Sequence, residues 1–182
     1  WFSGDHDFAI ARYKTDGSLD TTFSGDGRQV INFREFDESQ GVAIQTDGRI
    51  VVGGVACAVD GGNCVLALAR LNPNGTLDTT FSGDGKLITA VGLENGGWEL
   101  ALQGNKIVVA GYVNDGTSFN GAVYRYNSNG SLDSTFSGDG ILPVNFGADE
   151  YLTSIVVDSG KIYIAGWSGP SDGSSADFIV AR

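Results

Sequence analysis

One twelve-residue string occurs three times in this chain and constrains its fold more than any other feature. The copies are DGSLDTTFSGDG from Asp16, NGTLDTTFSGDG from Asn74 and NGSLDSTFSGDG from Asn129, which gives a period of about 57 residues. A second string, GRIVVGG, returns at the same period as NKIVVAG and GKIYIAG. Because independent motifs share one period, the sequence predicts a repeat protein in which each unit packs on its neighbours.

Each period contains four strand-like pieces separated by turn signals. In the second copy they are Val42 to Gln45, Arg49 to Ala56, Cys64 to Leu71 and Lys86 to Val91. The pieces are short and rich in β-branched residues, and they lack the periodicity of a long helix, which indicates antiparallel sheet. Four strands per period favour a propeller blade or a stacked β-array over a sandwich.

We therefore predict an all-β fold of repeated four-stranded antiparallel blades, a β-propeller-like array with partial blades at both ends. The expected units are a partial blade at 1–33, blades at 34–92 and 93–146, and a partial blade at 147–182. A closed propeller needs at least about four blades. We expect either a segment of a longer array or completion by other copies of the chain through open strand edges.

The long connection after each third strand is explained by turn and packing chemistry. Asp-Gly or Asn-Gly at its start tolerates positive φ, and a leucine and a phenylalanine recur in it as core anchors. Asp20, Asp78 and Asp133 each precede Thr-Thr or Ser-Thr. This pattern predicts a cap for a single helical turn.

The same loops supply weak candidates for a calcium site. Carboxylate oxygens suit Ca²⁺, but neither the start of an EF-hand loop nor the Ser-x-Asp-x-Gly box of sialidase-type propellers is present. The candidates are Asp16, Asp20, Asp26, Asp78, Asp84, Asp133 and Asp139. Turn chemistry explains these residues equally well, so no cofactor is expected and Ca²⁺ is the alternative.

The succession DFAIARY, TDGSLDTTFSGDG and GVAIQTDGRIVVGG resembles the delta-60 repeat family of bacterial repeat proteins. The resemblance extends over essentially the whole chain, with the order of the motifs kept in each copy. It implies a propeller-like β-array, found mostly in large secreted or cell-surface proteins, without an established activity. The second copy departs from the pattern by its Cys57 to Cys64 loop, and the third by Gln103-Gly104-Asn105 in place of an Asp-Gly turn.

The two cysteines lie on either side of a predicted hairpin turn. Cys57 and Cys64 flank Asp60-Gly61-Gly62, a strong turn signal between two strand-like stretches. This placement favours a disulfide, with two free thiols as the alternative, and the spacing does not match a zinc pair. Because disulfides belong to oxidising compartments, we expect an extracellular or cell-surface protein.

Charge and hydropathy restrict the partners. The formal net charge is −11, and without a basic cluster this argues against nucleic acid or an anionic membrane surface. No apolar run approaches the roughly 20 residues that a membrane-spanning helix needs. The expected partners are other copies of the chain or the rest of a longer repeat chain, with the ligand unknown.

The connections after the second and fourth strands differ between the copies and are expected to share one end of the array, where variable loops on a rigid scaffold bind ligands. They are Phe33 to Gln40, Cys57 to Cys64, Gly92 to Gly97, Asn114 to Asn120, Gly147 to Glu150 and Ser168 to Asp177. Their acidic residues form the tentative ligand-binding set: Glu35, Asp37, Glu38, Asp60, Glu94, Asp115, Asp149, Glu150 and Asp172. The aromatic residues in or beside them are Phe36, Trp98, Phe119 and Trp167.

Acidic groups beside aromatic rings suit Ca²⁺, a cationic partner or a sugar. The alternative is a solubilising acidic rim, with the aromatic rings covering blade edges. The sequence leaves both interpretations open.

No residue is predicted to be catalytic. His6 is the only histidine, and no Gly-x-Ser-x-Gly string supports a nucleophile. We expect a structural or binding module without catalytic activity. The alternatives are a Ca²⁺- or carbohydrate-binding propeller and, less favoured, a hydrolase or lactonase that uses loop carboxylates.

Overall fold

The computed structural model describes residues 6–58, 62–170 and 175–182. Within them the chain forms strands and turns without a helix, so the described residues hold none that could cross a membrane. In chain order the strands are β1 (Phe8–Ala11), β2 (Arg28–Ile31), β3 (Phe36–Ile44), β4 (Ile50–Cys57), β5 (Val65–Leu71), β6 (Lys86–Thr89), β7 (Glu94–Gln103), β8 (Lys106–Asn114), β9 (Phe119–Tyr126), β10 (Ile141–Val144), β11 (Asp149–Asp158), β12 (Lys161–Gly169) and β13 (Asp177–Ala181). The expected all-β fold class is confirmed.

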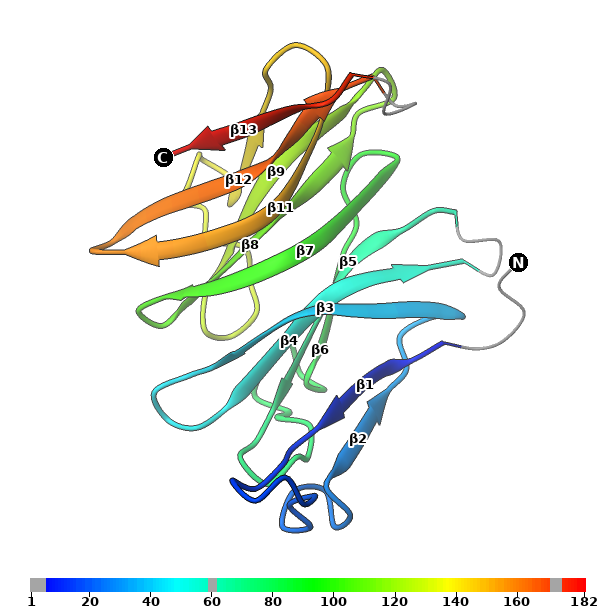
Figure 1. The fold of residues 1–182 in the computed structure, drawn as a ribbon, viewed down its shortest axis with the longest axis vertical. Helices are drawn as coiled ribbons and strands as arrows, with labels where there is room; N and C mark the ends of the chain where they lie inside the picture. Colours follow the sequence, from blue (N-terminus) through cyan, green and yellow to red (C-terminus); the bar gives the residue numbers. More distant parts are fainter. Residues whose placement is uncertain (1–5, 59–61, 171–174) are drawn as a thin grey trace.

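The strands form four antiparallel sheets that follow one another along the chain. The sheets contain β1 and β2, β3 to β6, β7 to β10, and β11 to β13, each with its strands in sequential order. Figure 1 shows the sheets stacked in a row, from the blue N-terminal sheet to the red C-terminal one, without closing into a ring. The architecture is that of successive propeller blades, because each sheet packs face to face against the next.

The first strands of the last three sheets lie side by side, since β7 contacts both β3 and β11. Each of these strands is interrupted once by a β-bulge, at Gln40, Trp98 and Thr153. A bulge bends a strand and increases its twist. The three bulges fall at equivalent places in the repeat, so the repeat fixes the curvature of each sheet as well as its strand order.

Apolar side chains form three core clusters, one at each junction between neighbouring sheets. The first contains Phe8 and Leu71, the second Phe81 and Tyr126, and the third Leu152. Every residue of β4 is buried, because both faces of its sheet are covered. Repeated packing of one face on the next is how a stacked repeat protein gains its core.

The loop after each third strand is a series of turns. After Asp20, Asp78 and Asp133 these loops form one hydrogen-bonded turn and no helix. The N–H of Phe81 donates to the Asp78 carbonyl at 2.9 Å, and Asp78 Oδ1 accepts the N–H of Thr80 at 3.1 Å and its hydroxyl at 2.7 Å, which is the predicted cap. Ser82, which follows this turn, has a φ of 53°, and this left-handed conformation prevents the turn from continuing as a helix.

An arginine at the end of each third strand holds this loop against the sheet. Arg70 Nε donates to Asp78 Oδ2 at 2.8 Å, and its guanidinium lies 4.9 Å from the centre of the Phe81 ring. Arg12 and Arg125 make the same contacts in the other two loops. A planar guanidinium suits both a carboxylate and an aromatic face, which explains why the repeat places an arginine here.

Candidate functional site

The variable connections and the Asp-Gly turns lie at opposite ends of the antiparallel sheets. At the variable end, the first strands begin earlier than predicted, at Phe36, Glu94 and Asp149. The second part of each corresponding predicted loop is therefore strand. Acidic residues placed there occupy fixed positions in a sheet, with one side chain facing inward and the next outward.

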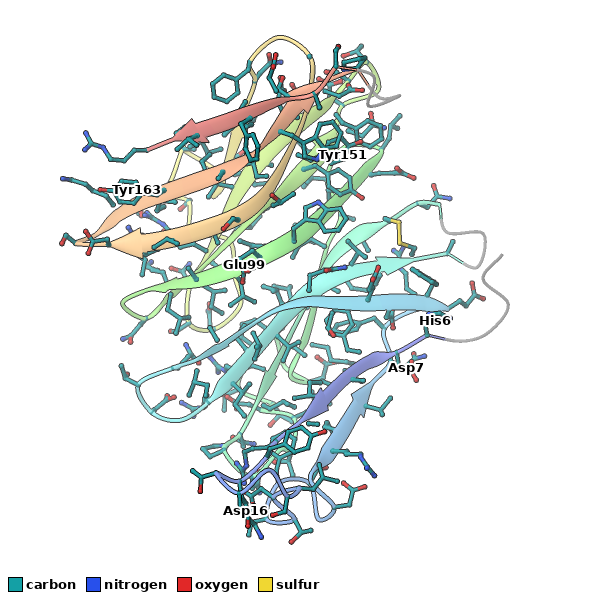
Figure 2. The ribbon with its side chains drawn as sticks, in the orientation of Figure 1. His6, Asp7, Asp16, Glu99, Tyr151 and Tyr163 are labelled. Carbon is teal, nitrogen blue, oxygen red and sulfur yellow. A yellow bond between two sulfur atoms is a disulfide. The ribbon has the colours of Figure 1, made fainter. Side chains whose placement is uncertain are left out.

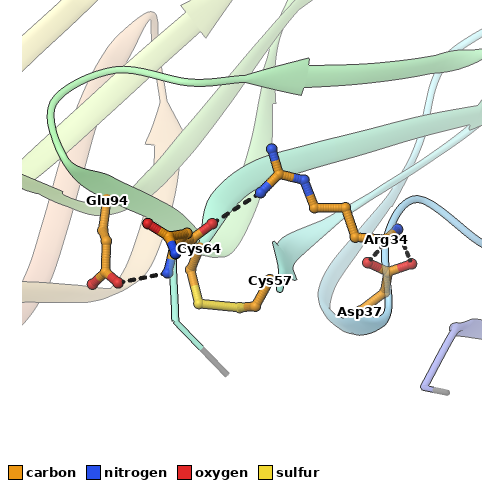
Figure 3. The surroundings of a disulfide bond; sticks show 6 residues. Arg34, Asp37, Cys57, Cys64 and Glu94 are labelled. Carbon is orange, nitrogen blue, oxygen red and sulfur yellow. Dashed lines mark hydrogen bonds between the residues drawn. A yellow bond between two sulfur atoms is a disulfide. The ribbon is translucent and has the colours of Figure 1, made fainter. Parts of the chain in front are cut away.

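Two predicted ligand residues point inward and serve the fold. Asp37 and Glu150 are 2% and 0% exposed. The Asp37 carboxylate accepts the N–H of Arg34 at 3.0 Å (Figure 3) and the N–H of Phe33 at 2.5 Å. Glu150 Oε1 accepts the N–H of Phe146 at 3.0 Å. A buried carboxylate that satisfies turn amides is a structural group. Both residues therefore have a structural role, and ligand binding by Asp37 and Glu150 stays a prediction.

Two other candidates connect neighbouring sheets. Glu94 Oε1 accepts the N–H of Asn63 at 2.8 Å, and Asp149 Oδ1 accepts the N–H of Phe119 at 3.0 Å. Both acidic side chains are half-buried. Each hydrogen bond fixes a loop or strand end of the preceding sheet. The two carboxylates lie at the variable end, Glu94 on the third sheet and Asp149 on the fourth.

The remaining candidates are more scattered. Glu35, Glu38 and Asp115 are exposed. The hydroxyl and N–H of Thr117 lower the pKa of Asp115 to about 2, because they stabilise its charged form. Asp60 and Asp172 lie outside the described residues. Within the described part of the chain, no three acidic, histidine or cysteine side chains come together as a metal site.

Five aromatic side chains from the third and fourth sheets meet at this end, and we call them the aromatic strip: Trp98, Tyr112, Phe119, Tyr151 and Trp167. Ring centroids in contact are 4.5 Å apart for Tyr151 and Trp167, and 6.5 Å apart for Trp98 and Tyr112. Figure 2 labels Tyr151, the member of the strip that contacts three of the other rings. Tyr112 is buried and the other four are half-buried, so the strip has both a packed side and an accessible side.

The hydroxyls in the strip remain protonated. Burial, reinforced by the charge of Glu94, raises the pKa of Tyr112 to about 12. Burial raises the pKa of Tyr151 to about 12 as well, reinforced by Asp149 and Glu94. A neutral phenol can donate and accept hydrogen bonds. The strip therefore combines apolar ring faces, two phenol groups and two nearby carboxylates.

Sequence reasoning located part of the strip. Trp98, Phe119 and Trp167 were indicated beside the variable loops, whereas Tyr112 and Tyr151 were missed. A signal was present, because Tyr112 and Trp167 both follow the last glycine of the repeated strand motif. Phe36, the fourth aromatic residue indicated, instead stacks on His6 with ring centroids 4.8 Å apart.

The expected disulfide is confirmed. Cys57 and Cys64 are bonded, with sulfur atoms 2.06 Å apart. Beside the bond, the Asn63 carbonyl accepts from Arg34 Nη1 at 2.9 Å, and the Asn63 N–H binds Glu94 (Figure 3). The crosslinked hairpin end is thus attached to residues on both of its sides.

The calcium candidates in the repeated loops are turn residues. Asp16, Asp26, Asp84 and Asp139 each accept the N–H group two residues further along the chain. Asp20, Asp78 and Asp133 each pair with an arginine. Turn and ion-pair geometry thus explains every one of these carboxylates.

Comparison with known proteins gives one family. A family model described as "Domain of unknown function (DUF5122) beta-propeller" matches residues 1–23, 45–81 and 105–136, about half of the chain. No curated protein matches the chain. The matched segments contain β4, β5, β8 and β9 with the repeated loops, while the first strands β3, β7 and β11 lie outside them.

Proposed function

The chain belongs to the DUF5122 beta-propeller family, and from this premise we propose that it is a non-catalytic binding module that acts outside the cell or at its surface. The family description names no activity, so the proposal depends on the residues of this chain. We assign the chain more finely to the delta-60 repeats on its three DGSLDTTFSGDG-type and three GRIVVGG-type strings. The ligand that we propose is a carbohydrate bound on the aromatic strip.

The aromatic strip is the observation that carries this proposal. Four of its five rings keep part of their surface accessible, and flat apolar faces with a few fixed polar groups are typical of small-molecule sites. Glu94 and Asp149 place carboxylate acceptors next to Tyr112 and Tyr151. Sugars present C–H faces to aromatic rings and hydroxyls to carboxylates, so they complement both parts of this surface.

One polar atom within the strip supports a ligand with hydroxyl groups. The indole Nε1 of Trp98 is buried and has no hydrogen-bond partner among the described residues. A buried donor without an acceptor costs free energy. A ligand hydroxyl that reaches this nitrogen relieves that cost, which an apolar ligand does not.

The remaining features fit the same proposal. The bond between Cys57 and Cys64 is typical of oxidising compartments. Asp37 and Glu150 hold backbone amides, which supports a structural role for these two carboxylates. We therefore propose binding without chemistry.

The test is a fluorescence titration of the intact chain. Trp98 and Trp167 are two of its three tryptophans, so a bound sugar changes the emission directly. The probes are cellohexaose, xylohexaose, chitohexaose and maltohexaose. We expect at least one of them to give a saturable change, and Trp167→Ala to weaken that binding at least about tenfold, as loss of a stacking ring does.

Tyr13→Ala is the matched control, because Tyr13 is an exposed aromatic residue at the opposite end of the sheets. It is expected to leave the titration unchanged. An absence of any saturable change with all four sugars contradicts the carbohydrate proposal. Equal weakening by Trp167→Ala and Tyr13→Ala contradicts the location.

A further inference from the structure

The turn that opens a repeated loop sits on the phenylalanine of the loop before it. At the first junction, a Cβ on Gly75 would be 2.9 Å from the ring of Phe23. The N–H of Ser24 donates to the Asn74 carbonyl at 2.7 Å, and Arg12 Nη1 donates to the carbonyl of the neighbouring proline. The ring is completely buried as a result.

The second junction has the same arrangement. A Cβ on Gly130 would be 3.1 Å from the ring of Phe81, the N–H of Ser82 donates to the Asn129 carbonyl at 3.0 Å, and Arg70 donates to the next turn. Phe81 is also completely buried. One pattern of contacts therefore joins successive units twice within this chain.

The third phenylalanine has no such cover in the described part of the chain. Phe136 is half-buried, although Arg125 lies over its ring at 4.5 Å as in the other two loops. Arg125 Nη1 donates to the side chain of Gln103 at 3.0 Å instead of to a turn carbonyl. The Phe136 ring and its arginine are thus in place, but no turn among the described residues covers them.

A cavity of about 460 Å³ adjoins the Phe136 ring. It lies between the third and fourth sheets, and its lining includes Phe136, Val123, Leu142, Ile162 and Ile164. At the second junction the side chains of Tyr126 and Leu132 pack against the equivalent residues, and at the first junction Leu71 and Leu77 do so. The cavity is therefore where the next unit would place two apolar side chains.

The third feature of each junction is an aspartate that pairs with two basic side chains. Arg49 and Arg70 both pair with Asp78 at 2.8 Å, and at the second junction a lysine and an arginine pair with Asp133 in the same way. Their counterparts in the last unit, Lys161 and Arg182, line the cavity. No acidic side chain in the described residues pairs with either of them.

We propose that Phe136, the cavity and the free edge of β13 form a docking site for one more turn-loop-strand segment of this repeat. The occupant has the pattern of residues 126–144. Its Asn-Gly turn covers Phe136, its large apolar residue and its leucine fill the cavity, its aspartate pairs with Lys161 and Arg182, and its strand extends the sheet beside β13. This interface continues the two junctions already present, and it is independent of sugar binding.

The experiment fuses a copy of residues 126–144 directly after Arg182 of the full chain and measures the melting temperature by calorimetry. Joining the segment to the chain gives it a high effective concentration, so weak affinity does not obscure docking. We expect the extension to raise Tm by about 5 °C or more. Phe136→Ala is expected to remove at least half of that increase, and the surface variant Lys161→Ala a smaller part.

The control extension has valine in place of the glycine that corresponds to Gly130. It is expected to raise Tm much less, because that position needs positive φ and has no room for a side chain over the ring. An extension that leaves Tm unchanged overturns the proposal, as does an increase that neither Phe136→Ala nor Lys161→Ala reduces. If light scattering shows a dimer of the unextended chain that persists in the extended chain at unchanged Tm, a second copy covers this face and the proposal is overturned.

Discussion

At the scale of single residues, the last glycine of each repeated strand motif is fixed by the strand beside it. Gly54, Gly111 and Gly166 pair with the residue that precedes each bulge. A Cβ at any of these glycines would collide with a carbonyl oxygen of the bulged strand. The motif therefore ends in glycine for steric reasons, since the bulge brings a backbone too close for any side chain.

Gly111→Ala is expected to lower the free energy of unfolding by about 3 kcal/mol, because the methyl group must displace backbone. Gly104→Ala is the matched control. Gly104 lies in a hairpin turn at a φ of 62°, with no atom within 4 Å of the place that the alanine methyl group would take, and left-handed strain alone costs about 1 kcal/mol. Urea unfolding measures both variants, and equal losses would contradict the role of the bulge.

A second residue-scale expectation concerns acid. Burial raises the pKa of Asp78, but the Thr80 hydroxyl and N–H and the Arg70 guanidinium outweigh it, so the net pKa is lowered from 3.8. A lowered folded-state pKa gives stability that is present above pH 3.8 and is lost as pH falls through the folded pKa. Asp78→Asn is therefore expected to lose less stability than the original chain between pH 5 and pH 3. Parallel stability curves in urea titrations would refute this.

Residue roles were the hardest to predict from sequence. Asp37, Asn95 and Glu150 occupy one repeat position and are all buried, and Asn95 Oδ1 accepts the N–H of Val91 at 3.2 Å, as the two carboxylates accept the N–H four residues earlier. Because three different residue types perform one structural task, the position did not stand out as part of the repeat. Its acidic members were consequently interpreted as variable loop residues.

At the scale of elements, the repeat predicted the second and third strands of each sheet closely and the first strands poorly. The second sheet was expected to begin at Val42 but begins at Phe36. The added residues, FDESQG, lack an apolar alternation. They are strand because the long strand β4 pairs with them across the bulge, and no local pattern reports a pairing of that kind.

The disulfide stabilises one hairpin end. Cys57→Ser combined with Cys64→Ser is expected to lower the free energy of unfolding by about 2 kcal/mol, because it frees a short closed loop in the unfolded chain. Urea unfolding of this variant and of the original chain in reductant should give similar losses. An unchanged midpoint in both would show that the crosslink does not contribute to stability.

At the scale of the whole molecule, the proposed binding and the stability of the fold both depend on the junctions between sheets. The aromatic strip takes Trp98, Tyr112 and Phe119 from the third sheet and Tyr151 and Trp167 from the fourth. Its shape is therefore set by how two sheets pack. The sequence supplied the rings nearest the loops, but only the packing of the third sheet on the fourth joins them with the two tyrosines.

The whole chain is expected to be indifferent to calcium. The carboxylates of its three repeated loops are engaged by turn N–H groups and arginines, so a cation added there would have to displace them. Millimolar CaCl₂ or excess EDTA should change Tm by less than about 1 °C, since only a ligand that binds the folded state stabilises it. A saturable rise with CaCl₂ that EDTA reverses would contradict this.

The claim on which the rest depends is that one sheet design is repeated along the chain, and hydrogen exchange followed by mass spectrometry tests it most directly. We expect the slowest exchange in the central strands β4, β8 and β12, each of which pairs on both sides. We expect the repeated loops to exchange at similar intermediate rates because they share their backbone hydrogen bonds. Unlike protection in the three equivalent strands, or a helix-like stretch of protection between Phe8 and Arg182, would contradict the account.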